Sequence, residues 1–163
     1  MFLNKRKIIL LINISSLIFF TTLNQVSSQE LRVVDGDTIH LDGEKIRFTG
    51  IDTPELKQTC VNEEIIDPCG LTAKEILIDK ISDNKVECIS EGKDQYKRIL
   101  AECFVNGDSL SSYLVRSGYA FAYRKYSKKF IPDEDYAKAN QIGIWSMKFD
   151  YPWDYRKALR DKR

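Results

Sequence analysis

Residues 31–55 read LRVVDGDTIHLDGEKIRFTGIDTPE, and short β-branched runs alternate in this stretch with Asp-Gly turns. The runs are Leu31–Val34, Thr38–Leu41 and Lys45–Ile51, and an Asp-Gly pair separates each run from the next. Runs of this composition between Asp-Gly pairs are typical of consecutive β-hairpins. The stretch therefore predicts three adjacent strands.

Farther along, the pattern predicts a helix, a second hairpin and two more helices. Apolar residues recur at helical spacing in the first of these segments, and Gly92 marks the hairpin turn. Asp108 is a favourable N-cap, and Pro132 suits a first helical turn. The expected elements are a helix over 71–82, strands over 85–90 and 96–105, and helices over 109–117 and 131–141. This order predicts an α+β fold around a five-stranded antiparallel OB-type β-barrel with about three helices.

Composition fits one folded domain. The chain has 163 residues, of which 43% are hydrophobic and 11% aromatic, enough to build a core. Lys and Arg number 25 against 24 Asp and Glu, so no global basic field indicates a nucleic acid or membrane partner. Function must therefore be sought in local clusters.

The N-terminal segment has the pattern of a targeting signal. Lys5, Arg6 and Lys7 precede an apolar run over Ile8–Phe20 that is short for a membrane span, and small residues end at Ser28. We expect residues 1–28 to be a cleaved secretory signal, with an uncleaved anchor as the alternative. Its removal leaves 22 basic and 24 acidic residues in the mature chain. We expect that chain to consist of one domain over 29–147 and a basic, aromatic tail over 148–163 that is extended or partly helical.

Four cysteines agree with export to an oxidising compartment, because an even set can pair completely. Three connectivities are possible. Cys60 and Cys69 close a short loop, while Cys88 and Cys103 lie in two runs that resemble neighbouring strands, which favours these two pairs. A zinc site is the rival interpretation, but the chain has no Cys-x-x-Cys pair and its one histidine, His40, is distant in sequence.

Acidic residues gather in the opening hairpins. Positions 30–55 hold seven acids and three bases, and Pro54 stiffens the loop that carries Asp52 and Glu55. Two carboxylates, a backbone carbonyl and waters suit Ca²⁺ or Mg²⁺. Arg47 and Arg98 add two guanidinium groups, and a cation, two such groups and a spare carboxylate are what phosphodiester cleavage needs.

Five motifs in order resemble those of the thermonuclease, or staphylococcal-nuclease-like, family, here in an exported bacterial form. The resemblance covers about residues 31–146. It rests on Asp-Gly-Asp-Thr at 35–38, Arg-x₄-Asp-Thr-Pro-Glu at 47–55, Tyr-x-Arg at 96–98, Leu-Val-Arg-x-Gly-x-Ala at 114–120 and Ile-Trp-Ser at 144–146.

The resemblance implies an OB-type barrel and a Ca²⁺-dependent endonuclease that acts on DNA and RNA and leaves 3′-phosphate ends. By this resemblance Asp37 and Asp52 are carboxylate ligands of the metal, and Thr53 supplies a carbonyl ligand. The remaining implied roles are water activation by Glu55, phosphate binding and transition-state stabilisation by Arg47 and Arg98, turn formation behind the ligands by Asp35, and a phosphate hydrogen bond from Tyr96.

The chain departs from the family pattern beside Tyr96. Lys97 stands where the family usually has Gly, which predicts an altered turn or an added phosphate contact, and Gln95 replaces a basic residue. The four cysteines are a further departure.

A basic and aromatic segment over 116–129 suits single-stranded nucleic acid, since bases stack on rings while Lys and Arg follow phosphates. Tyr123 and Tyr126 are the expected stacking residues, and Tyr119 and Phe121 are equally well explained as core. The chain is expected to act as a monomer without a stable protein partner or a membrane. Two alternatives remain, a non-catalytic nucleic-acid-binding module on the same barrel and an exported metal-binding envelope protein.

Overall fold

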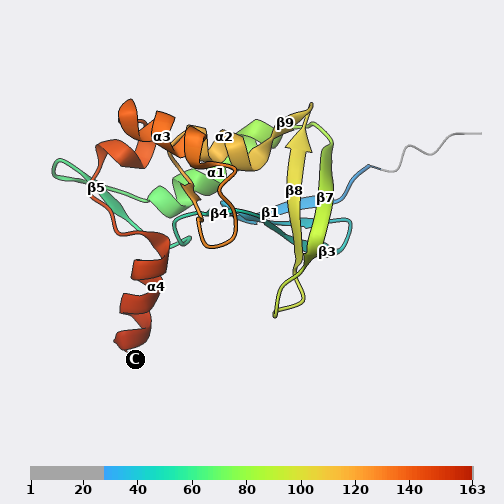
Figure 1. The fold of residues 1–163 in the computed structure, drawn as a ribbon, viewed down its shortest axis with the longest axis horizontal. Helices are drawn as coiled ribbons and strands as arrows, with labels where there is room; N and C mark the ends of the chain where they lie inside the picture. Colours follow the sequence, from blue (N-terminus) through green and yellow to red (C-terminus); the bar gives the residue numbers. More distant parts are fainter. Residues whose placement is uncertain (1–27, 163) are drawn as a thin grey trace, which may run out of the picture.

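A computed structural model describes residues 28–162 as a mixed α+β fold, as expected (Figure 1). The main sheet has the strand order β1-β2-β3-β8-β7, with β9 paired to β8. Its strands are β1 Leu31–Asp35, β2 Thr38–Leu41, β3 Glu44–Phe48, β7 Val86–Lys93, β8 Ile99–Val105 and β9 Asp108–Ser109. Neighbours are antiparallel except β3 and β8, which are parallel, so the sheet is mixed.

Two small sheets were not predicted. β4 (Ile51–Asp52) pairs with β10 (Phe121–Ala122), and β5 (Cys60–Asn62) pairs with β6 (Ile65–Asp67). These strands are two or three residues long, so periodicity gives no signal for them. The expected single strand over 45–51 is broken because Gly50 adopts a φ of 72°, which turns the chain between β3 and β4.

The three expected helices are present with slightly different bounds. They are α1 Cys69–Ile81, α2 Leu110–Arg116 and α3 Ile131–Ala139, followed by the 3₁₀ turn η1 Gly143–Ser146 and the helix α4 Pro152–Asp161. The N-cap of α2 is Ser109 rather than Asp108, since the Ser109 hydroxyl accepts the Ser112 N–H at 3.3 Å. Asp108 lies in β9 and pairs with Lys80.

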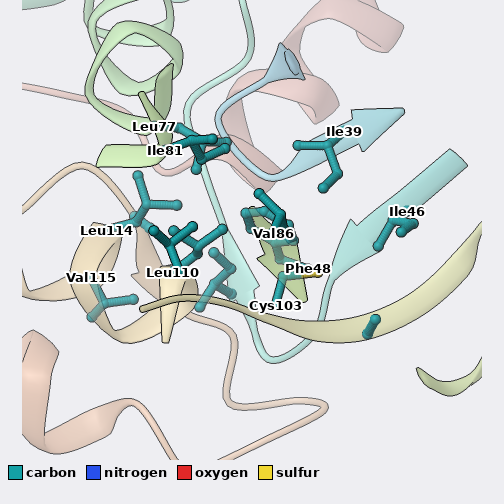
Figure 2. Close-up of a cluster of buried hydrophobic side chains, with 14 of the residues drawn as sticks. Ile39, Ile46, Phe48, Leu77, Ile81, Val86, Cys103, Leu110, Leu114 and Val115 are labelled. Carbon is teal, nitrogen blue, oxygen red and sulfur yellow. The ribbon is translucent and has the colours of Figure 1, made fainter. Parts of the chain in front are cut away.

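The main core lies between the sheet and helices α1 and α2. Figure 2 shows Leu77 and Ile81 of α1 and Leu110 and Leu114 of α2 facing strand residues such as Phe48. Each of these side chains is at most 1% exposed. This packing holds the β1–β4 segment, which carries the acidic residues, in one conformation.

A second, aromatic cluster joins the C-terminal segment to the domain. Phe121 is buried at its centre, 5.2 Å from the rings of both Trp145 and Tyr151 and 6.2 Å from Trp153. Phe121 is therefore a core residue, which was one of the two roles considered for it, and not part of an exposed nucleic-acid surface. The tail after residue 148 is docked by its aromatic residues, and α4 begins directly after Tyr151.

Both favoured disulfides, Cys60–Cys69 and Cys88–Cys103, are confirmed. Free cysteines are absent from residues 28–162, which excludes the zinc alternative. The expected signal over 1–28 lies outside the described residues except for Ser28. In the described part of the chain, no helix is both long enough and apolar enough to span a membrane.

Candidate active site

Two buried aspartates and an arginine form the centre of the site. Asp37 lies in the turn between β1 and β2, Asp52 ends β4, and Arg47 projects from β3. The Arg47 guanidinium donates to Asp37 Oδ1 at 2.6 Å and to Asp52 Oδ1 at 2.7 Å. The structure thus brings together three of the residues that the sequence placed in one site.

Burial gives these carboxylates unusual electrostatics. Asp37 is 2% exposed and Asp52 is fully buried. Burial raises the pKa of Asp37 to about 7 against the lowering effect of Arg47, and the negative charges of Asp35 and Asp52 raise this pKa as well. Arg47 alone therefore does not offset the cost of burying the negative charge of Asp37.

The Asp-Gly-Asp-Thr motif holds Asp37 from several sides. Asp35 Oδ1 accepts the Asp37 N–H at 3.2 Å, and the Thr53 N–H reaches Asp37 Oδ2 at 3.3 Å. A Cβ at Gly36 would stand 2.9 Å from Thr53 Oγ1, so glycine permits this close approach. Asp35 and Thr53 therefore both contact Asp37 directly.

Glu55 lies at the open side of the site and contacts a residue that sequence analysis missed. Its side chain is 40% exposed, and its Oε1 accepts Arg156 Nη1, from α4, at 2.7 Å. Arg156 also bonds both oxygens of Asp52, with Nη2 to Oδ2 at 2.7 Å and Nη1 to Oδ1 at 3.2 Å. The sequence shows an acidic excess over 30–55 and a basic tail, but no local pattern predicts that they meet, because Glu55 and Arg156 are 101 positions apart.

The loop after Glu55 is held by a buried glutamine. Gln58 Oε1 accepts the Glu55 N–H at 3.1 Å, and Gln58 Nε2 donates to the Asp150 carbonyl at 2.7 Å, just before α4. A Cβ at Gly70 would stand 1.9 Å from the Glu55 carbonyl oxygen, so the start of α1 presses directly on this loop. The backbone of Glu55 is therefore enclosed, although its carboxylate is not.

Arg98, Tyr96 and Lys97 lie apart from this cluster, in the turn between β7 and β8. Arg98 Nε donates to Asp94 Oδ2 at 2.7 Å, and the guanidinium lies 5.7 Å from the centre of the Tyr96 ring. Lys97 has a φ of 64°, a backbone region that favours glycine, so a lysine stands here at a position that glycine would adopt more easily. In Figure 1 this hairpin and α4 are widely separated.

The predicted stacking tyrosines have different environments. Tyr126 is 70% exposed. The Tyr123 ring instead stacks on Trp153, with centroids 5.8 Å apart and planes 7° apart, and meets Tyr126 edge-on at 5.0 Å. One face of Tyr123 is therefore already used to dock the tail.

Comparison with known proteins identifies the relatives of this fold and site. Residues 45–147 match the family model described as staphylococcal nuclease homologue. A succinoglycan biosynthesis protein, ExoI, of Rhizobium meliloti (strain 1021) is 32% identical over 117 residues, which are 69% of this chain and 61% of that protein. An uncharacterized endonuclease of Haemophilus influenzae (strain ATCC 51907 / DSM 11121 / KW20 / Rd) is 29% identical over 153 residues, covering 86% and 79% of the two chains. The thermonuclease of Staphylococcus hyicus is 30% identical over 134 residues, covering 76% and 78%.

The family match covers the segment that carries Arg47, Asp52, Glu55 and Arg98 and ends before α4. With the fold and the motif residues in place, the chain belongs to the staphylococcal nuclease homologue family.

Proposed function

We propose that this protein is an exported, Ca²⁺-dependent endonuclease that hydrolyses phosphodiester bonds of DNA and RNA. The nuclease class rests on the family match and on relatives named endonuclease or thermonuclease. The observation that carries the proposal is the joining of Asp37 and Asp52 by one guanidinium, with the carboxylate of Glu55 beside them.

The donor set fits a hard cation. In the described residues Asp37 Oδ2 and Asp52 Oδ2 each accept one hydrogen bond, so each keeps a lone pair for a cation, and Thr53, which hydrogen-bonds Asp37 through its N–H, offers a carbonyl. Among the described residues no group of three or more His, Cys, Asp or Glu side chains is arranged to hold a metal ion, so the side chains alone do not form a complete metal site. Water is a common ligand of Ca²⁺ and would have to supply the remaining positions. Bound there, Ca²⁺ would supply charge neutralisation at the scissile phosphate.

The side chains divide the remaining work. Glu55 orients the attacking water and takes its proton, while Arg47 and Arg98 bind the phosphate and stabilise its developing charge. Arg47 projects from β3, and Arg98 lies in the turn directly before β8, the strand that pairs with β3. Water attack on phosphorus with departure of the 5′-oxygen leaves a 3′-phosphate end.

A single strand is the favoured substrate, bound by a monomer. The exposed ring of Tyr126 is available for base stacking, and Lys97 adds a positive charge next to Tyr96 in the β7–β8 turn. Lys125, which lies 5.5 Å from the Tyr126 ring, adds a charge for the phosphate backbone.

Export is supported by the disulfides and by the pattern of residues 1–28. Two bridges in a chain of this size are typical of an oxidising compartment, whether periplasm or medium.

Digestion of single-stranded DNA tests the function directly. The oxidised protein over 29–163 is incubated with substrate in Ca²⁺ and in chelator, beside Glu55→Ser. We expect cleavage that needs Ca²⁺ and is lost in the variant. Strand binding without cleavage would favour the binding-module alternative, and Ca²⁺ binding without either would favour the envelope protein.

A further inference from the structure

We propose that Arg156 of α4 is a positioning residue of the active site, which holds the carboxylates of Glu55 and Asp52 in their working orientation. This inference rests on the proposed function and extends it to a helix outside the family match.

Glu55 depends on Arg156 for its orientation. Its side chain is 40% exposed, and across residues 28–162 its carboxylate has one hydrogen-bond partner, the Arg156 guanidinium. A glutamate without this contact would sample several rotamers. Because the bond uses Oε1, Oε2 is left to accept a proton from water. The contact therefore orients the group without covering it.

Asp52 gains a second cation from the same guanidinium. Arg156 binds both of its oxygens as a fork, and Arg47 binds Oδ1 from the other side. A fully buried carboxylate needs such pairing, since an unpaired buried charge is strongly unfavourable. Two guanidiniums thus face the three carboxylates of Asp37, Asp52 and Glu55, which leaves one net negative charge.

The helix that carries Arg156 is docked by other residues. The Trp153 ring lies between Tyr151, at 4.6 Å and 9°, and Tyr123, at 5.8 Å and 7°. Pro152 is buried, and the Tyr155 hydroxyl donates to the Lys57 carbonyl at 3.3 Å. Since α4 is held by these contacts, a change at Arg156 can be separated from undocking of the helix.

The experiment measures kcat and KM on single-stranded DNA in saturating Ca²⁺. It compares the wild-type protein with Arg156→Ala, Arg156→Lys and, as a matched control, Arg160→Gln, which lies one turn farther along the same helix and is exposed. We expect Arg156→Ala to lose about 10-fold to 100-fold in kcat, as misplaced catalytic groups do, with KM changed far less. The kcat of Arg156→Lys should lie between those of the wild type and Arg156→Ala, because lysine keeps the positive charge but cannot form the two-pronged contact of the guanidinium.

Chemical rescue separates positioning from stability. Added guanidinium ion, at concentrations that leave the melting temperature unchanged, should restore part of the kcat of Arg156→Ala and leave Arg160→Gln unaffected. Restoration is not expected if Arg156 merely holds the fold.

Each other outcome overturns the proposal. An unchanged kcat in Arg156→Ala would leave Arg156 without a role, and a raised kcat would make α4 an inhibitory cap. A loss accompanied by a lowered melting temperature and no rescue would reduce Arg156 to a docking contact. A wild-type chain that does not cleave would overturn the proposed function itself, and this is seen before any variant is made.

Discussion

At the residue scale, Asp37 and Asp52 differ in the number of cations around them. Asp52 accepts bonds from two guanidiniums, whereas Asp37 accepts one, together with the Thr38 hydroxyl at 3.0 Å. Burial raises the pKa of Asp37 to about 7. Asp37 is therefore the carboxylate that gains most from an added cation.

Asp37→Asn should weaken Ca²⁺ binding about tenfold or more, since loss of one buried negative charge beside the ion costs on the order of 1–2 kcal/mol. Calorimetric titration of the protein without substrate measures this. Asp42→Asn is the control, because Asp42 is an exposed residue of the next Asp-Gly turn. A titration that Asp37→Asn leaves unchanged would remove Asp37 from the ligand set.

The sequence predicted the site residues that lie close together in the chain, but it missed Arg156, their partner from the C-terminal tail. Asp37 and Arg47 come from the β1–β2–β3 hairpins, whose pairing is encoded locally by Asp-Gly turns, and Asp52 follows β3 closely in the chain. Arg156 arrives through aromatic packing between distant segments, which leaves no spacing signal in the chain.

At the element scale, Glu134 ties α3 to β10, the strand that pairs with β4 next to Asp52. It is fully buried and accepts the Ala122 N–H at 3.0 Å, Arg124 at 2.6 Å and Lys138 at 2.9 Å. Burial acts to raise the pKa of Glu134, but the hydrogen bonds from Arg124, Lys138 and Ala122 outweigh it and hold this pKa below its ordinary 4.5.

A carboxylate with a lowered pKa stabilises the fold above its unfolded-state pKa, and this stability is lost as the pH falls through the folded-state value. The difference in unfolding free energy between wild type and Glu134→Gln should therefore be complete near pH 7, about 1–3 kcal/mol for a buried charge-assisted network. It should shrink as the pH falls below 4.5. Urea unfolding at several pH values measures it, and a difference independent of pH would contradict the role of the charge.

The elements that the sequence predicted are those long enough to show a periodic pattern of apolar residues. α1 and α2 have apolar residues at helical spacing, and all four of their ends lie within two residues of the predicted bounds. β4, β5, β6 and β10 are defined by their partners, so only the folded chain shows them. At the break, a Cβ on Gly50 would also stand 2.9 Å from the ring of Phe130, a contact with a later segment that no local pattern shows.

At the scale of the whole molecule, the two disulfides reinforce different regions. Cys60–Cys69 closes the β5–β6 hairpin at the start of α1, and Cys88–Cys103 joins β7 to β8. The bridges span 9 and 15 residues in sequence. They therefore constrain the unfolded chain on both sides of α1.

Each bridge should contribute about 2–3 kcal/mol by constraining the unfolded chain, so reduction should lower the melting temperature markedly. Circular dichroism with and without reductant measures this. The double variant Cys88→Ser/Cys103→Ser should show part of the decrease without reductant and the rest with it. An identical melting temperature in both conditions would show that the bridges add no stability.

The docking of α4 also has a consequence for biosynthesis. The ribosome makes the chain from its N-terminus, so Asp52 is synthesised 104 residues before Arg156. A nascent chain that has just completed α3 contains the acidic cluster and Arg47, but not Arg156, the partner of Glu55. Under the proposed roles, the site therefore reaches its full activity only after the last helix of the domain has been translated and packed.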